Sequence, residues 1–355
     1  MNKDIKPFLI PSDTAVKLAM KQLESTEKRT LFVVDDNFEL VGSLVDGDIR
    51  RWILAEGGLD APVEKVCNKN PYYVTRQHDL NEIKNVMVTR KILCVPVLNE
   101  RREIVELIFW ENLFKGEITK KPFHPVDLPV VIMAGGKGTR LDPFTRILPK
   151  PLIPIGDKTV IEMIIDSFLN HSVTSFYVTV NYKSKIIKSY FDELKPPYSI
   201  TYIDEDKPLG TAGSLRYLQG RLTTPFIVTN CDIIIKADYS DLVDFHTKNN
   251  NAITMVASLR NYNIPYGICE IENGGLLKKI TEKPEYSFLV NAGMYVLNPD
   301  ILRYIPQNEI FHITQLIETV RQAGGRIGVF PVSENSWLDI GEWAEYKKAL
   351  RKFEF

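Results

Sequence analysis

The chain has 355 residues, of which 44% are hydrophobic and 25% are charged, and its formal net charge is −1. This length exceeds what a single hydrophobic core usually supports, so we expect two domains of an ordinary globular protein. The near-neutral charge provides no field that would gather nucleic acid or anionic lipid, and neither is expected as a partner. Any phosphate-binding site must therefore depend on local basic groups.

The cysteines and the start of the chain favour a cytoplasmic location. The four cysteines are scattered and form no Cys-x-x-Cys pair, which is typical of reduced residues in an intracellular protein; they are Cys67, Cys94, Cys231 and Cys269. The N-terminus lacks the apolar stretch of a secretory signal. No run of 18 apolar residues occurs, so we expect no membrane-spanning segment.

The first 115 residues contain a weak internal repeat. A shift of 64 positions places Val33 and Val34 on Val97 and Leu98. The same shift superposes two apolar helical stripes, Val16, Ala19, Leu23 and Leu80, Ile83, Met87. Each copy is predicted to contain an amphipathic helix, a strand (31–34 or 93–97), a polar turn and a second strand. Two copies of one βαβ-type unit would bury each other's faces, although two unrelated α/β segments could also resemble each other by coincidence.

Residues 41–51 read Val-Gly-Ser-Leu-Val-Asp-Gly-Asp-Ile-Arg-Arg and resemble the end of a CBS domain, named after cystathionine β-synthase. Such domains occur as tandem pairs that commonly bind adenine nucleotides and dimerise, so the resemblance implies a homo-oligomer. The family's ribose-binding pattern is Ser or Thr, two residues, then Asp. Here Val45 precedes Asp48 and Phe109 precedes Asn112, so the hydroxyl is missing in both copies. A nucleotide-binding module and a purely structural or dimerising module therefore remain alternatives.

A linker is predicted between the two domains. Residues 115–127 are polar, contain two prolines and show no periodicity. We place the tandem CBS pair at 1–117, the linker at 118–127 and the second domain at 128–355. In that domain, strand-like runs alternate with amphipathic stretches, which favours a largely parallel α/β sheet covered on both faces. The predicted strands are 130–133, 176–180, 226–229 and 252–258, and the predicted helices include 160–169, 184–194 and 313–323.

A glycine-rich turn follows the first of these strands: residues 134–141 read Ala-Gly-Gly-Lys-Gly-Thr-Arg-Leu. Three glycines in four positions let the backbone approach a ligand and direct several N–H groups into one concavity, which suits phosphate oxygens. Lys137 and Arg140 add positive charge. The turn is not a Walker A motif, because Gly138 follows the lysine. It is not a dinucleotide fingerprint, because Leu141 stands where a glycine is needed.

The segment that follows resembles one enzyme family. Residues 141–152, Leu-Asp-Pro-Phe-Thr-Arg-Ile-Leu-Pro-Lys-Pro-Leu, resemble the signature of nucleoside-diphosphate-sugar pyrophosphorylases, the sugar-1-phosphate nucleotidyltransferases. Five further segments follow in the family's order: Leu-Gly-Thr-Ala-Gly at 209–213, Asn-Cys-Asp at 230–232, Glu-Lys-Pro at 282–284, Asn-Ala-Gly at 291–293 and Trp-Leu-Asp-Ile-Gly at 337–341. The resemblance covers about residues 128–355 and implies a Rossmann-like, GT-A-like mixed sheet.

In this family a sugar-1-phosphate oxygen attacks the α-phosphorus of a nucleoside triphosphate and pyrophosphate leaves, so positioning and charge neutralisation dominate catalysis. Asp232 follows a predicted strand, where a carboxylate emerges at the ligand edge of an α/β sheet. The resemblance implies that Asp232 and Asp339 hold Mg²⁺, which prefers oxygen ligands.

The resemblance also implies a set of site residues. The implied catalytic residues are Arg140, Lys150, Asp232 and Lys283. The implied nucleotide-binding residues are Ala134, Gly135, Gly136, Lys137, Gly138, Thr139, Arg140, Glu205, Gly210 and Thr211. The implied sugar-phosphate-binding residues are Gly267, Glu282, Lys283 and Asn291.

Glu205 indicates which base the enzyme uses. In uridylyl and thymidylyl relatives this position, five residues before Gly210, is typically glutamine, whose amide donates and accepts hydrogen bonds. A carboxylate only accepts, which suits the two parallel donors of guanine. We therefore predict GTP as the donor substrate. A uridylyl or thymidylyl donor remains the alternative, as does a solvated loop position for Glu205.

A tandem CBS pair followed by a pyrophosphorylase-like domain most resembles the guanylyltransferases of legionaminic acid synthesis, which act on glucosamine 1-phosphate. Mannose- or heptose-1-phosphate guanylyltransferases are alternatives. A glycosyltransferase that consumes a nucleotide sugar is disfavoured, because residues 230–232 are Asn-Cys-Asp and not Asp-x-Asp. An inactive nucleotide sensor is disfavoured because both aspartates and the three cationic positions are present.

Overall fold

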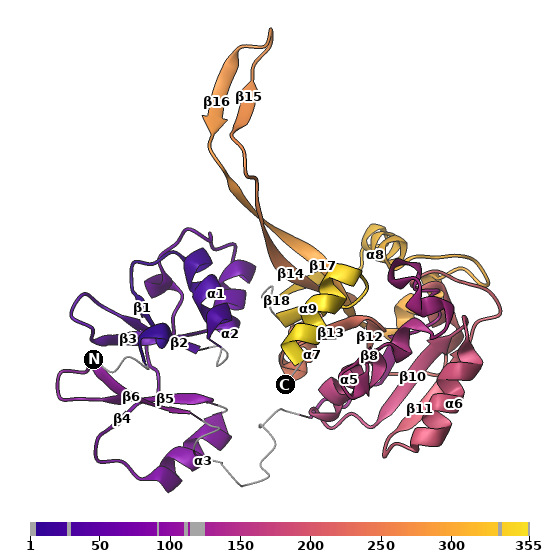
Figure 1. The fold of residues 1–355 in the computed structure, drawn as a ribbon, viewed down its shortest axis with the longest axis horizontal. Helices are drawn as coiled ribbons and strands as arrows, with labels where there is room; N and C mark the ends of the chain where they lie inside the picture. The colour runs from indigo at the N-terminus through magenta and orange to yellow at the C-terminus, as the bar shows by residue number, and fades with distance from the viewer. Residues whose placement is uncertain are drawn as a thin grey trace. The chain divides into compact units, whose positions relative to one another are not determined.

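The computed structural model describes residues 5–26, 30–90, 92–109, 113, 125–332 and 336–353 (Figure 1). The chain divides into two compact units, residues 1–126 with 170–172, and residues 127–169 with 173–355. Across these described ranges, no helix is both long enough and apolar enough to cross a membrane.

The N-terminal unit contains two copies of one motif. In each copy two parallel strands are joined by a helix, and a third strand pairs antiparallel with the second. The first copy comprises β1 (Leu9–Pro11), α1 (Val16–Ser25), β2 (Thr30–Val34), β3 (Leu40–Val45) and then α2 (Asp46–Leu54). The second comprises β4 (Val74–Thr75), α3 (Leu80–Arg90), β5 (Cys94–Leu98) and β6 (Ile104–Phe109).

At an offset of 64 residues, the two copies share the same strand register and the same hydrogen bonds in the turn. The β2–β3 register shifts between Val33 and Val34, and the β5–β6 register shifts between Val97 and Leu98. After β2, Asp35 Oδ1 accepts hydrogen bonds from the backbone N–H groups two and four residues on, at 2.9 and 2.8 Å. After β5, the oxygen Asn99 Oδ1 does the same at 3.0 and 2.9 Å. Coincidental likeness does not explain this agreement.

The copies share one apolar core, in which Phe32, Val34 and Leu40 cluster with Cys94 and Leu98. The predicted helical stripes are buried, with one exception. Leu80 is 50% exposed, so the buried part of its stripe begins at Ile83. Leu80 is the first residue of α3, where the helix follows an exposed loop, and the next stripe residue along, Ile83, is fully buried.

The second unit contains a seven-stranded mixed sheet in the order β11-β10-β7-β12-β17-β14-β18. All its strands are parallel except β17, which runs antiparallel to both β12 and β14. The strands are β7 (Val130–Met133), β10 (Ser175–Val180), β11 (Ser199–Asp204), β12 (Phe226–Asn230), β14 (Ile253–Asn263), β17 (Glu285–Leu297) and β18 (Ile327–Val332). The helices are α5 (Val160–Leu169), α6 (Ser184–Leu194), α7 (Tyr239–Lys248), α8 (Ile313–Gln322) and α9 (Trp343–Phe353). The smaller pairs are β8 (Pro154–Ile155) with β9 (Lys158–Thr159), and β13 (Ile233–Ile235) with β19 (Trp337–Asp339).

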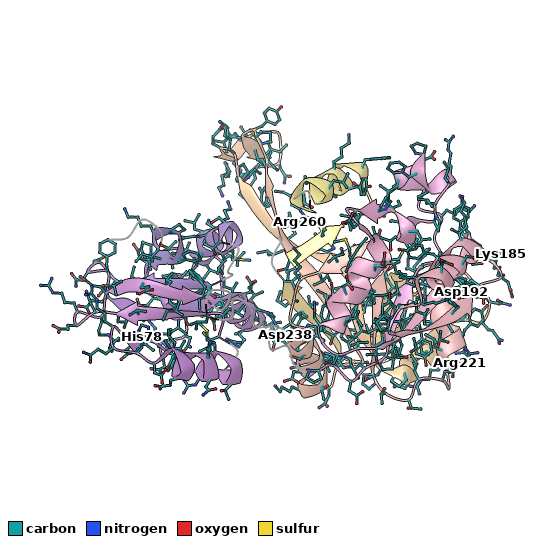
Figure 2. The ribbon with its side chains drawn as sticks, turned by 60° about the horizontal axis from the view of Figure 1, so that its bottom comes forward. His78, Lys185, Asp192, Arg221, Asp238 and Arg260 are labelled. Atoms are coloured by element: carbon teal, nitrogen blue, oxygen red, sulfur yellow. The ribbon has the colours of Figure 1, made fainter. Side chains whose placement is uncertain are left out.

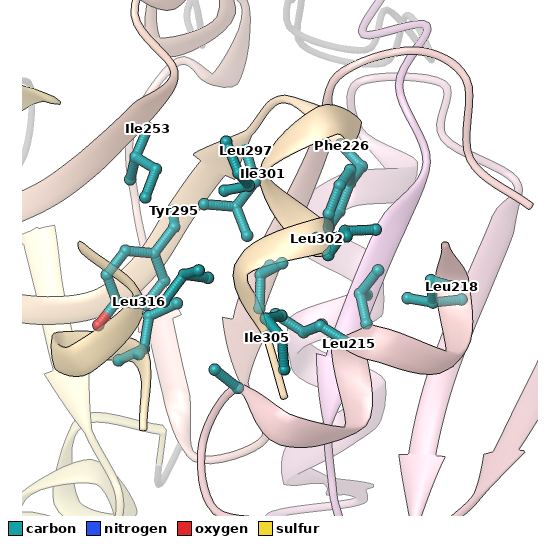
Figure 3. Close-up of a cluster of buried hydrophobic side chains, with 14 of the residues drawn as sticks. Leu215, Leu218, Phe226, Ile253, Tyr295, Leu297, Ile301, Leu302, Ile305 and Leu316 are labelled. Carbon is teal, nitrogen blue, oxygen red and sulfur yellow. The ribbon is translucent and has the colours of Figure 1, made fainter. Parts of the chain in front are cut away.

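A cluster of buried apolar side chains holds the middle of this sheet against α8 and two 3₁₀ segments (Figure 3). Phe226, Leu297 and Leu302 in this cluster are fully buried. Complete burial of one such side chain stabilises a fold by roughly 1.5–3 kcal/mol. The cluster thereby fixes β12, whose end leads to the predicted metal ligand Asp232.

The strands β14 and β17 continue beyond the sheet as a two-stranded ribbon. Pairing between β14 and β18 ends at Ser258, whereas pairing between β14 and β17 continues to Asn263 and Glu285. A further hairpin of β15 (Ile268–Ile271) and β16 (Leu277–Thr281) lies at the end of the ribbon, which Figure 1 shows extending away from the sheet. We call residues 259–289 the arm. The predicted strand 252–258 ended at the point where the arm begins, so the sequence did not predict the arm.

Candidate active site

The carboxyl ends of the parallel strands bring several predicted residues to one edge of the sheet. The strand β7 leads into the glycine-rich loop 134–138, and β11 ends immediately before Glu205. The strand β12 ends two residues before Asp232. Open α/β sheets bind ligands at this edge, because the loops that follow parallel strands converge there.

Lys150 and Asp232 form an ion pair in which Lys150 Nζ donates to Asp232 Oδ2. Only 11% of the lysine side chain and 10% of the aspartate side chain are exposed. Lys150 begins a 3₁₀ turn between Pro149 and Pro151, whose rings restrict the backbone on both sides. The cation therefore has a fixed position against the carboxylate.

The short pair β13–β19 brings Asp339 beside Asp232, since Ile233 lies opposite Asp339 in its register. The Ile340 N–H donates to the Asp232 carbonyl oxygen at 2.8 Å. A Cβ atom on Gly341 would lie 2.7 Å from Asp232 Oδ2 and 2.7 Å from Asp339 Oδ1. The two carboxylates therefore face one small space, which glycine leaves open.

This pair of carboxylates fits the predicted Mg²⁺. Burial raises the pKa of Asp339, and the charge of Asp232 raises it further. The hydrogen bond from the Gly341 N–H lowers this pKa, as do the positive charges of Lys150 and Arg140. A divalent cation would relieve the repulsion between the two groups, and Mg²⁺ in proteins is commonly held by one or two carboxylates with substrate phosphates and water. Among the described residues, no group of three or more His, Cys, Asp or Glu side chains is placed to hold a metal.

Arg140 lies at the exposed side of this cluster. Its Nη2 is 4.0 Å from Asp232 Oδ2, and its Nη1 donates to Glu342 Oε1 at 3.2 Å. More than half of the arginine side chain is exposed, so it can turn toward a ligand. Glu342 was not predicted from the sequence. The one feature that could have indicated it is its position directly after the motif 337–341.

The glycine-rich loop is partly open to solvent. Ala134 is buried, and its N–H donates to the Thr179 carbonyl oxygen at 3.0 Å. Gly138 has a φ of +67°, and a Cβ atom there would lie 2.9 Å from Lys150 Cβ, so the loop needs glycine to pass the lysine. A Cβ atom at Gly136 would meet nothing within 4 Å. Lys137 in the loop and Thr139 directly after it are also exposed.

Glu205 is buried, with 8% exposed, so the interpretation as a solvated loop acid is wrong. Its Oε2 accepts a hydrogen bond from the Leu209 N–H at 3.3 Å. A Cβ atom on Gly135 would lie 2.7 Å from Glu205 Oε1. Burial raises the pKa of Glu205, and the Leu209 hydrogen bond lowers it. The carboxylate therefore touches the glycine-rich loop at the place where a nucleotide is expected.

Gly210 and Thr211 contact the segment that leads into α8. Gly210 has a φ of +80°, and a Cβ atom there would lie 2.7 Å from the Phe311 carbonyl oxygen. The hydroxyl of Thr211 accepts a hydrogen bond from the Ile313 N–H at 3.0 Å. These contacts position the loop, and direct nucleotide contact by the two residues stays a prediction.

The structure does not bring all the predicted sugar-phosphate residues to this edge. Asn291 lies at the base of the arm, where its Oδ1 accepts from the Gly293 N–H at 3.0 Å. Gly267 and Glu282 meet each other within the arm, since a Cβ atom on Gly267 would lie 2.9 Å from Glu282 Oε2. Lys283, with a φ of +44°, is an exposed residue of the arm just before β17. Roles for these residues on the sugar phosphate stay predictions.

Comparison with known proteins decides the family. The profile of the nucleotidyl transferase family matches residues 129–354. The chain belongs to this family. A CBS domain profile matches residues 1–55, which contain the first of the two N-terminal copies. The predicted α/β nucleotidyltransferase fold with an N-terminal CBS domain is thereby confirmed.

Individual relatives of this nucleotidyl transferase are similar to it over part of their length. The chain is 33% identical to a mannose-1-phosphate guanyltransferase of Yarrowia lipolytica, over 60% of each chain. It is 36% identical to a mannose-1-phosphate guanyltransferase of Pichia angusta, over 62% of each chain. It thus spans less than two thirds of the length of these relatives. Among solved structures, HddC from Yersinia pseudotuberculosis is 25% identical with a TM-score of 0.51, over 64% of this chain and 100% of that one.

Proposed function

We propose that this protein transfers a guanylyl group from GTP to a sugar 1-phosphate, which yields a GDP-sugar and pyrophosphate. The observation that carries the proposal is the convergence of Lys150, Asp232 and Asp339 around Gly341, at the strand edge that also holds the glycine-rich loop. Membership of the nucleotidyl transferase family supports the reaction class.

The proposed reaction forms one P–O bond and breaks another. A phosphate oxygen of the sugar 1-phosphate attacks the α-phosphorus of GTP, and the bond from that phosphorus to the β-phosphate bridging oxygen breaks. Arg140 and Lys150 would neutralise the phosphates, and the N–H groups of residues 134–138 would bind phosphate oxygens. Mg²⁺ held by Asp232 and Asp339 would supply further positive charge on the phosphate oxygens. The ion pair with Lys150 fixes the orientation of the Asp232 carboxylate.

Two observations support guanine as the base. Glu205 is a buried carboxylate against the glycine-rich loop, and a carboxylate accepts two hydrogen bonds such as those of the guanine N1–H and amino groups. The named relatives from Yarrowia lipolytica and Pichia angusta are guanyltransferases. A uracil or thymine base would place a carbonyl against this carboxylate, with unpaired groups that cost roughly 1–3 kcal/mol each.

For the sugar, the order of a CBS pair followed by this catalytic unit favours glucosamine 1-phosphate, by resemblance to the legionaminic acid guanylyltransferases. Mannose 1-phosphate is the second candidate, favoured by the names of the relatives. One hydroxyl or amino group separates such substrates, and a site that hydrogen-bonds such a group discriminates strongly against its absence.

The test is a cross of four nucleoside triphosphates with a panel of hexose and aminosugar 1-phosphates, with Mg²⁺. Pyrophosphate release and the mass of the product are measured. We expect a GDP-sugar. Exclusive formation of a UDP- or dTDP-sugar would overturn the assignment of the base. Sugar transfer from a GDP-sugar to an acceptor would support a glycosyltransferase instead, and zero turnover with tight GDP-sugar binding would support a sensor.

A further inference from the structure

The arm exposes large apolar side chains along its whole length. They are Tyr262, Tyr266, Ile271, Leu276, Leu277, Ile280, Tyr286, Phe288 and Leu289, each between 41% and 74% exposed. In the β15–β16 hairpin, Cys269 lies opposite Ile280 and Ile271 opposite Leu277, whereas Glu270 lies opposite Lys279. Cys269 and Ile280 therefore lie on one face of the hairpin and Glu270 and Lys279 on the other, up to the register shift between Glu270 and Ile271. An isolated hairpin is marginally stable in water, and contiguous exposed apolar side chains mark interaction surfaces.

The first residues of the arm pack against the catalytic unit, and this contact fixes the position of the arm where it leaves the sheet. Arg260 packs over the Trp337 ring, with 4.6 Å between the guanidinium carbon and the ring centroid. Trp337 lies in the same strand, β19, as the predicted metal ligand Asp339. Figure 2 shows Arg260 at the root of the arm.

The direction of the arm places Lys283 away from the Asp232–Asp339 edge of its own chain. From Asn291 to Glu285 the β14–β17 register has no shift. Six residues of strand at about 3.3 Å each span about 20 Å. Lys283 lies beyond this span. To return Lys283 to the Asp232 of its own chain, the ribbon would have to break strand pairs, whereas a second chain could receive it unchanged.

The charges at the strand edge favour the arrival of another cation. Lys150 is paired with Asp232, and Arg140 is paired with Glu342. These two cations therefore already face carboxylates, and Lys137 of the glycine-rich loop is exposed. Two phosphate-bearing substrates would add several negative charges, which calls for additional fixed cations. The Glu282–Lys283 segment of the arm offers one.

We infer that the arm of one copy of this chain docks on the catalytic unit of a second copy and places Glu282 and Lys283 at the Asp232–Asp339 edge of that copy. The exposed apolar side chains of the arm become buried in this exchange. The two active sites of the dimer are then each built from both chains. The inference rests on the proposed function and adds a partner to its site.

Complementation between two inactive variants tests the exchange. Lys283→Ala lacks the arm cation, and Asp232→Asn lacks the metal ligand. We expect each homodimer to lose activity, Lys283→Ala by roughly 10- to 150-fold. Heterodimers, co-expressed with two tags and purified on both, contain one complete site if the arm is exchanged. They should regain about half of the wild-type pyrophosphate release per dimer. Activity no higher than that of the two homodimers would show that each arm serves its own chain and would overturn the inference.

Two further measurements keep the inference separate from the proposed function. Lys278→Ala removes another exposed lysine of the arm and should keep wild-type activity in the same assay. Sedimentation equilibrium measures the docking without any activity: the wild type should be at least a dimer, and the double variant Ile271→Lys, Ile280→Lys should associate more weakly than the wild type. A wild type that stays monomeric at assay concentrations with both substrates overturns the arm exchange even if GDP-sugar forms. A dimeric wild type without transferase activity contradicts the proposed function alone.

Discussion

Lys150 and Asp232, which lie 82 residues apart in the sequence, form an ion pair from which water is almost completely excluded. Removal of one partner from such a pair leaves an uncompensated buried charge, which typically costs about 3–5 kcal/mol of stability. The same pair stands at the proposed metal site. Substitutions here therefore affect both stability and catalysis, and each prediction needs a measurement of both.

Asp232→Asn keeps the size of the side chain and removes its charge. We expect kcat/KM to fall by at least about 100-fold, since a metal ligand contributes several kcal/mol to the transition state. The free energy of unfolding should also fall, because Lys150 loses its partner. Pyrophosphate release and urea unfolding measure the two effects. Asp244→Asn is the matched control, since its ion pair with Lys248 is exposed and contributes little. Wild-type activity in Asp232→Asn would end the metal assignment.

Gly341→Ala introduces a Cβ atom into the space between the two carboxylates, 2.7 Å from an oxygen of each and 3.1 Å from Lys150 Nζ. The carboxylates must move apart, and displacements of about 1 Å at a reacting centre can cost on the order of 100-fold in rate. We expect the loss of kcat to exceed the loss of thermal stability. Gly58→Ala is the control, because a Cβ atom there meets nothing within 4 Å. Unchanged kcat in Gly341→Ala would mean that the space is not used.

Glu205→Gln replaces two acceptors by one acceptor and one donor without a change of shape. The kcat/KM for GTP should fall by roughly 5- to 150-fold, which corresponds to the 1–3 kcal/mol of an unpaired polar group, and that for UTP or dTTP should rise. Steady-state kinetics with each triphosphate provides the measurement. The neighbouring Asp204→Asn changes only an exposed ion pair with Lys188 and should leave the base preference unchanged. An unchanged preference in Glu205→Gln would exclude contact with the base.

The same substitution should change how stability depends on pH. Burial raises the pKa of Glu205 above its ordinary value of 4.5, so the folded chain binds this proton more tightly than the unfolded chain does. The free energy of unfolding contributed by Glu205 is therefore highest at low pH and falls as the pH rises from 4.5 through the folded-state value. Glu205→Gln removes the titrating group, so the variant does not lose this stability as the pH rises. Thermal melting between pH 5 and pH 8 should show the variant gaining on the wild type as the pH rises, and a constant difference would contradict the prediction.

The family and the α/β order of the elements could be predicted from the sequence, because both depend on local patterns. The predicted helices 160–169 and 184–194 match α5 and α6 exactly, since apolar periodicity marks the face that each buries. The repeat offset of 64 residues located equivalent turns at Asp35 and Asn99, because a turn depends on a few neighbouring side chains.

Only the tertiary structure decided which distant groups meet. Asp232 and Asp339 become neighbours through the β13–β19 pairing, and pairing between strands that are far apart in sequence leaves no local periodic signal. The burial of Glu205 depends on a close approach to Gly135 that no spacing encodes. The arm was not predicted because its length depends on how far β14 and β17 stay paired beyond the sheet, and no local pattern encodes that distance.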